Sequence, residues 1–194
     1  MLAYYAILAT IATTIALVAG ASSNPSPTAY TFHLDAAMAM RHFPWLHFHV
    51  AGTGEYHRGQ DYVVHLTQMP FFVRGHNEID LSALDPSMWA KQFTVAHVTQ
   101  HDGMTTFDLR ERASESQDQN PLIEALVTLD AQQSTRDVVM RYAHGEIHLT
   151  LTLGDTQGYR LPATLTADID MPGEALVAHA NFSDYTILQS DQSV

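Results

Sequence analysis

The chain of 194 residues contains no cysteine. Disulfide bonds therefore contribute nothing to its stability, and no cysteine follows the apolar N-terminal segment to carry a lipid anchor. A single domain of this length has enough residues to bury a sizeable hydrophobic core. Burial of apolar side chains must therefore hold the fold together without covalent help.

Basic residues are also scarce. The chain has nine Lys plus Arg against 21 Asp plus Glu, a formal net charge of −12 with neutral histidines. This charge repels nucleic acid and anionic membrane surfaces, so we exclude nucleic-acid binding. The twelve histidines would bring the net charge close to zero in mildly acidic surroundings, because an unperturbed histidine titrates near pH ~6.5.

The motifs of common enzymes are missing as well. No G-x-S-x-G motif is present, and the serine, histidine and aspartate residues are too scattered to select a catalytic triad. Asp168 and Asp170 share one face of an expected strand, but such spacing is common on exposed surfaces, and a glycosidase would normally have a larger fold. We therefore predict a protein that is not an enzyme and uses no cofactor.

The first 21 residues are uncharged and apolar, and they end in the small-x-small motif AGA. This pattern predicts an export signal cleaved after Ala21. An apolar run of ~20 residues is also long enough to span a bilayer, so an uncleaved N-terminal anchor stays open. We expect an export signal at 1–21, a Ser/Pro-rich linker at 22–29, a folded domain at 30–187 and a polar tail at 188–194.

From Tyr30 onward, apolar and polar residues alternate in segments separated by turn signals such as His101-Asp102-Gly103. This pattern predicts an antiparallel sheet of about nine to eleven strands. Residues 30–41 are rich in Ala and Met and are also compatible with a helix. We favour a strand, because residues 43–45 then form a turn into the next one. Gly52 and Gly54 inside that next strand indicate a bulge or strong bend, so the sheet is expected to curl.

Residues 70–92 break the alternation. The segment holds Pro70 and Pro86, and Asp85 is placed to cap a short helix over 86–92. Its apolar side chains predict that this irregular segment crosses and covers one face of the sheet.

Several phrases carry a family resemblance: "GTGEYHRGQDYVVHL" followed by "MPFF", "HDGMTTFDL", "LVTLDAQQSTRDVVMRYAHGEIHLTLTL", "GYRLPATLTADI" and "NFSDY". Their order and spacing over most of residues 30–187 resemble the LolA-like superfamily of exported lipid and lipoprotein carriers. The resemblance implies a mainly β fold in which one antiparallel sheet curls into a half-barrel. It also implies helices across the concave face, an apolar cavity for acyl chains, and a periplasmic or extracellular location.

The histidines raise the question of a metal site, above all His47 and His49, which are two residues apart on one strand. Hairpin pairing places His65 opposite residue 52 or 53, ~10–14 Å from His49. The same reasoning places His33 near residue 53 or 54. His97 with His101 and His144 with His148 have helical zinc spacing, but both pairs fall in β pattern. We predict no metal site and expect these histidines to be solvated.

The apolar strand faces are the better functional candidate. They either pack against segment 70–92 as a filled core or line a cavity for a lipid or other acylated molecule. Our leading hypothesis is the cavity, and the alternative is a cell-envelope protein-interaction or sensor domain with a filled core. The predicted lining residues are Leu46, Phe48, Val50, Val64, Leu66, Phe71, Phe72, Leu84, Met88, Trp89, Leu149 and Leu151.

Overall fold

The computed structural model describes residues 27–43, 45–57, 62–68, 78–80, 93–111, 120–132 and 134–188. All regular secondary structure in these ranges is β-strand. The strands are β1 (Ala29–Met40), β2 (His47–His57), β3 (Tyr62–Gln68), β4 (Glu78–Asp80), β5 (Phe93–His101), β6 (Met104–Glu111), β7 (Leu122–Leu129), β8 (Thr135–Tyr142), β9 (Glu146–Thr156), β10 (Tyr159–Met171) and β11 (Glu174–Leu188).

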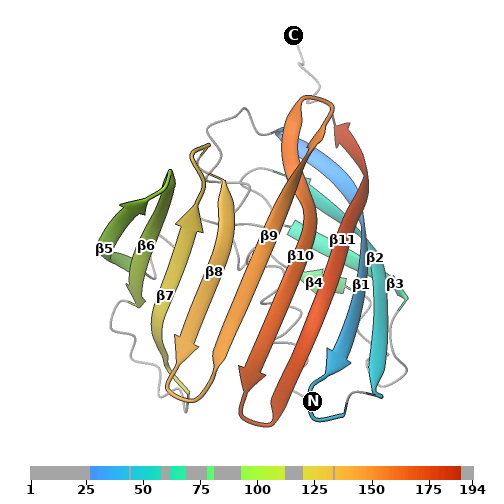
Figure 1. Ribbon diagram of the computed structural model, residues 1–194. Coiled ribbons are helices and arrows are strands. Elements are labelled where there is room, and N and C mark those ends of the chain that lie inside the picture. The colour runs from blue at the N-terminus through green and yellow to red at the C-terminus, as the bar shows by residue number, and fades with distance from the viewer. Residues whose placement is uncertain are drawn as a thin grey trace.

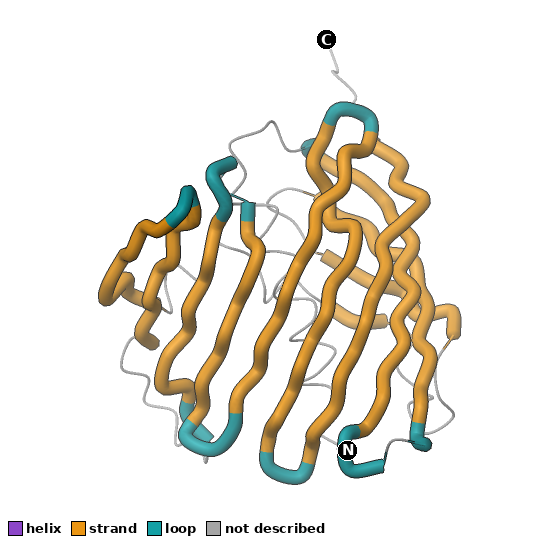
Figure 2. The backbone as a smooth tube through the Cα atoms, viewed as in Figure 1, coloured by secondary structure: helices purple, strands orange, loops and turns teal. Residues whose placement is uncertain are grey.

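The eleven strands form one sheet in the order β4-β3-β2-β1-β11-β10-β9-β8-β7-β6-β5. All neighbours pair antiparallel, and β1 joins the two halves by pairing with both β2 and β11. The sheet curls so that β2, β3 and β4 lie behind β9–β11 in the view of Figure 1, and Figure 2 shows the long central strands joined by short turns. Among the described strands β4 and β5 are the two edges and do not pair with each other, so the sheet is open, and the predicted mainly β, curled antiparallel fold is confirmed.

The ambiguous segment after Tyr30 is a strand, as predicted. β1 runs to Met40, and the chain then turns back, with the amide of Leu46 donating to the carbonyl of Phe43 at 2.8 Å. Alternate β1 residues are buried, which is what a strand with one covered face requires. Tertiary packing of these alternate side chains outweighs the helix propensity of alanine and methionine.

One part of segment 70–92 differs from the prediction. Residues Glu78–Asp80, expected to be irregular, form the short strand β4, which pairs with β3 through Val64↔Ile79. Three residues are too few for a period-two pattern to stand out, and only the partner strand defines them. The predicted helix over 86–92 lies outside the described residues.

The two glycines inside β2 have different roles. The register between β2 and β3 shifts at Ala51 and Gly52, and the extra residue is Thr67, so the bulge expected inside β2 lies in its partner β3. Gly54 instead makes room for a ring: a Cβ built there would lie 2.0 Å from the Phe32 side chain, which is itself buried. Glycine thus lets the aromatic ring of β1 lie flat across the backbone of β2, close to the bend of the sheet.

We predict that Gly54→Val lowers the free energy of unfolding by about 1–3 kcal/mol, because the new side chain overpacks against the buried Phe32 ring. Gly154→Ala is the matched control, since its Cβ would meet only the Ala163 methyl at 3.4 Å. Urea unfolding of the two variants and the wild type measures the difference. Equal stability of all three proteins would contradict the proposed ring packing.

Candidate functional site

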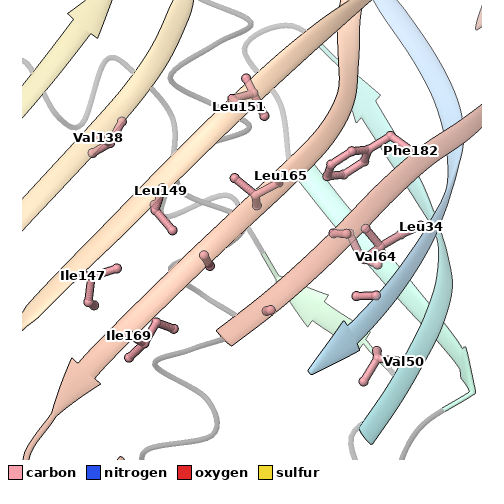
Figure 3. Packing of buried hydrophobic residues seen from close by; sticks show 14 of the residues in the cluster. Leu34, Val50, Val64, Val138, Ile147, Leu149, Leu151, Leu165, Ile169 and Phe182 are labelled. Atoms are coloured by element: carbon pink, nitrogen blue, oxygen red, sulfur yellow. The ribbon is translucent and has the colours of Figure 1, made fainter. Parts of the chain in front are cut away.

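The sheet has one apolar face, here called the inner face. Figure 3 shows its side chains gathered on the concave side, among them Leu149 and Leu165 from the middle of the sheet and Val50 and Val64 from its curled end. On β1, β9, β10 and β11 the buried inner positions carry only apolar side chains, and they belong to one connected cluster. The large members are Tyr30, Phe32, Leu34, Ile147, Leu149, Leu151, Leu161, Leu165, Ile169, Leu176 and Phe182.

Five of the predicted lining residues are buried in this cluster: Val50, Val64, Leu66, Leu149 and Leu151. Phe48 lies on the inner face of β2 and is half-buried. Leu46 was predicted to be covered, but it precedes β2 at the edge of the sheet and is 40% exposed. The other predicted residues, Phe71, Phe72, Leu84, Met88 and Trp89, lie outside the described residues.

Sequence reasoning missed a patch of four alanines at the centre of the inner face. Ala36 of β1 pairs with Ala180 of β11, and Ala178 of β11 pairs with Ala167 of β10. All four are at most 3% exposed. Because alanine itself fills little space, larger apolar groups must lie close against the backbone at these four positions. Alanines at alternate positions in "LDAAMAM" and "VAHANF" are the sequence signal of this patch.

Aromatic rings fill one end of the inner face. Tyr30 lies 4.9 Å from Tyr56 and 5.7 Å from Tyr185, and Phe32 lies 5.8 Å from Phe182, measured between ring centroids. These separations are those of favourable tilted aromatic pairs. Burial, with a smaller contribution from the neighbouring tyrosine, raises the pKa of both Tyr30 and Tyr185. Both phenols therefore stay neutral, and the rings close this end of the face.

The last two phrases of the family resemblance meet at this aromatic end. Tyr185, from "NFSDY", donates its hydroxyl proton to the carbonyl of Pro162, from "GYRLP", at 2.6 Å. The register of β10 against β9 shifts between Pro162 and Thr164. The register of β11 against β1 shifts opposite Thr31 and His33, where Asp184 of β11 has a φ of 53°. The hydrogen bond thus joins two strands where bulges interrupt their ladders.

We predict that Tyr185→Phe lowers the free energy of unfolding by about 1–2 kcal/mol, because the half-buried Pro162 carbonyl loses its donor while the ring packing stays. Tyr159→Phe is a suitable control, since Tyr159 also contacts the core but its hydroxyl has no hydrogen-bond partner among the described residues. Thermal unfolding of both variants measures the effect. A Tyr185→Phe protein as stable as the control would mean that the hydrogen bond contributes nothing.

Methionines mark the opposite end of the inner face. Met38 and Met40 at the end of β1 and Met171 at the end of β10 pack against the core but are only partly buried. Phe48 of β2 pairs with Met38 across the sheet. We call this group the methionine edge. Flexible thioether side chains at a half-exposed edge can repack around an inserted apolar group more easily than rings can.

The outer face is polar, and it carries the histidines that the sequence analysis considered as metal ligands. His33 and His65 both lie opposite Thr53 on either side of β2, as the hairpin registers predicted. His49 contacts Asp35 at 3.0 Å, and His148 contacts Asp137 at 2.7 Å. Among the residues that the structure describes, no group of three or more histidine and acidic side chains is placed to hold a metal ion.

One carboxylate is buried, at the β7–β8 turn. Asp130 accepts hydrogen bonds from the backbone amides of Gln132 and Ser134 and from the guanidinium of Arg136, with Arg160 3.7 Å away. Burial works to raise the pKa of Asp130, but the amides of Ser134 and Gln132 and the Arg136 guanidinium outweigh it and hold the pKa below its usual range. Because every contact of this carboxylate belongs to the turn or its neighbours, we assign it to holding the turn.

We predict that Asp130→Asn lowers the free energy of unfolding by about 1–3 kcal/mol at pH 7. A carboxyl with a depressed pKa in the folded state stabilises above its unfolded pKa of ~3.9, and this contribution disappears as the pH falls through the folded value. The difference from wild type should therefore shrink in acid, and urea unfolding at pH 7 and below pH 4 measures it. A constant difference would show that the charge is not responsible.

Comparison with known proteins supports the fold. No family model matches the sequence, and no curated protein does. Among solved structures, a LolA superfamily protein from Nitrosomonas europaea matches with a TM-score of 0.58 at 7% identity, covering 93% of each chain. A DUF1329 family protein from Desulfovibrio piger matches with a TM-score of 0.57 at 7% identity, covering 96% of this chain and 92% of that one.

A third structure extends the same likeness. A domain from Vibrio parahaemolyticus, named as an outer membrane lipoprotein-sorting protein, matches with a TM-score of 0.55 at 10% identity, covering 85% of this chain and 87% of that one. The chain therefore has a LolA-like fold, as the resemblance in its sequence predicted. Identities this low establish the fold alone.

Proposed function

We propose that this protein is an exported, non-catalytic carrier that holds a lipid or other acylated molecule against its inner face. The observation that carries the proposal is the alanine patch at the centre of that face. Ala36, Ala167, Ala178 and Ala180 are buried, and they form a row of small side chains among larger apolar neighbours. An acyl chain is long and narrow, and it suits a row of small side chains that crosses adjacent strands.

The energetics favour such a ligand. Each methylene group that leaves water for an apolar site contributes about 0.8 kcal/mol, so a fatty acyl chain gains several kcal/mol without any polar contact. The alanine patch lies between Phe182 on the aromatic side and Met38 on the methionine side. Because the rings close one end of the inner face and the methionines lie at the half-exposed other end, we infer that the ligand's polar head stays at the methionine edge.

Several features support this reading over an enzyme. The buried inner positions of the four central strands carry no charged side chain, and the phenols of Tyr30 and Tyr185 stay neutral because burial raises the pKa of both. The LolA-like fold occurs in a protein named for lipoprotein sorting. We further propose that segment 70–92, with Phe71, Phe72, Leu84, Met88 and Trp89, covers the ligand, and that the uncharged N-terminal segment directs export to the periplasm or cell exterior.

Two neighbouring residues of β1 provide a matched test. Ala36 faces the inner side and is buried, whereas Ala37 is exposed on the outer side. We predict that Ala36→Leu reduces co-purifying lipid about fivefold or more, because the larger side chain occupies the ligand's place, and that Ala37→Leu leaves it unchanged. Mass spectrometry of lipid extracted from each purified protein measures the occupancy.

Stability measurements on the same proteins separate the two hypotheses. If a removable ligand occupies the space, Ala36→Leu should leave the lipid-free protein as stable as the wild type. A loss of about 1–3 kcal/mol in Ala36→Leu, together with a wild type that carries no lipid, would mean that the protein's own side chains fill the interior. That result would reject the carrier and favour a cell-envelope interaction domain.

A further inference from the structure

The turn between β1 and β2 exposes an unusual amount of apolar surface. We call residues 41–43 and 45–46 the β1–β2 tip. Trp45 is 76% exposed, Phe43 49% and Leu46 40%, which makes three of the six large exposed hydrophobic residues that the structure describes. Single exposed apolar residues are ordinary, but two aromatic rings and a leucine within one short turn form an apolar patch of the kind found at interaction sites.

The tip is held in place. The Leu46 amide donates to the Phe43 carbonyl, the Met40 amide donates to the Leu46 carbonyl at 3.2 Å, and the Arg41 amide donates to the Ala175 carbonyl of β11 at 2.8 Å. The Phe43 and Trp45 rings meet edge to face, with centroids 5.6 Å apart. The rings are therefore presented to solvent by a fixed turn, so little conformational freedom is lost when they bind.

The charges around the tip differ from those of the whole chain. No aspartate or glutamate occurs from residue 36 to residue 54, although the chain carries a net charge of −12. The same stretch contains Arg41, His42 and His47, all exposed. Arg41 also forms an ion pair with Asp168 of β10. The apolar patch is thus flanked by hydrogen-bond donors and by the Arg41 guanidinium, which suit phosphate groups.

The tip directly adjoins the methionine edge. Met40 is the last residue of β1, and its amide bonds to Leu46 of the tip. Ala39 and His47 are the last residues that pair between β1 and β2, and the Met40 amide bonds to Leu46 directly beyond them. Leu46 therefore lies opposite Met40, on the inner side of the sheet. The aromatic end with Tyr30 and Tyr185 is at the opposite end of β1. A surface that contacts the tip therefore also lies beside the half-exposed end of the inner face.

We propose that the β1–β2 tip docks the protein on the interface of a phospholipid bilayer, with Trp45 and Phe43 at the level of the headgroups. Tryptophan prefers this interface, since its ring is apolar and its N–H remains free to bond to lipid oxygens. A protein partner is a poorer fit to the patch. Two rings and a leucine present far less than the about 800 Å² that each side of a stable protein interface buries.

The fluorescence of Trp45 provides the test of this proposal. In a Trp89→Phe background, which leaves Trp45 as the single tryptophan, vesicles of brominated phosphatidylcholine are added to the full chain. We expect the emission of Trp45 to shift to the blue and to be quenched most by bromines near the glycerol end of the acyl chains. Phe43→Ser/Leu46→Ser should reduce the quenching about fivefold or more, because both changes remove apolar surface beside the reporter.

Val95→Ser/Val98→Ser is the matched control. It removes two exposed apolar side chains from β5, at the far edge of the sheet, and should leave the quenching unchanged. Trp45 that stays unquenched by vesicles, or equal quenching with and without Phe43 and Leu46, overturns the proposal. Unquenched Trp45 together with crosslinks from position 43 to an envelope protein would assign the tip to a protein partner. Vesicle docking and lipid occupancy of the inner face are separate readouts, so either proposal can fail alone.

Discussion

Every part of this structure depends on covering one face of a sheet that is a single layer thick. Antiparallel strands alternate between two faces, and from Tyr30 to Met40 the even-numbered residues of β1 are all apolar and face inward. Leaving such a face in water would cost about 25 cal/mol for each Å² of apolar surface. The fold reduces the exposed area by curling the sheet, and it leaves a concave surface on which something apolar must lie.

Curling requires local departures from a regular ladder. Bulges interrupt β3 at Thr67, opposite Gly52, β10 near Pro162 and β11 near Asp184, and each bulge increases the local twist. At such places the backbone loses regular partners, and side chains take over. The Phe32 ring covers Gly54, and the Tyr185 hydroxyl bonds to the Pro162 carbonyl. The aromatic end therefore combines bulged strands with side-chain contacts that take the place of regular ladder partners.

The sequence predicted what local periodicity governs. It placed His65 opposite residue 52 or 53 and His33 near residue 53 or 54, and both lie opposite Thr53. It also assigned the strand from Tyr30 and the turn that follows it, because alternation and short hairpins determine their own registers. It missed β4, since three residues carry no period of their own. It also missed the alanine patch, whose members come from β1, β10 and β11. Only the pairing of strands distant in sequence brings them together.

The exposed fraction of a side chain was harder to predict than the face of the sheet on which it lies. Leu46 does point to the inner side, opposite Met40, but 40% of it remains exposed because it lies beyond the first residue of β2. Alternation tells which side a residue faces, whereas the extent of cover depends on where the neighbouring strands end. Here the strands end so that rings close one edge of the inner face, while methionines and the β1–β2 tip lie at the other. The two ends of one apolar face thus differ in side-chain type and exposure, and the position proposed for the ligand's polar head depends on this asymmetry.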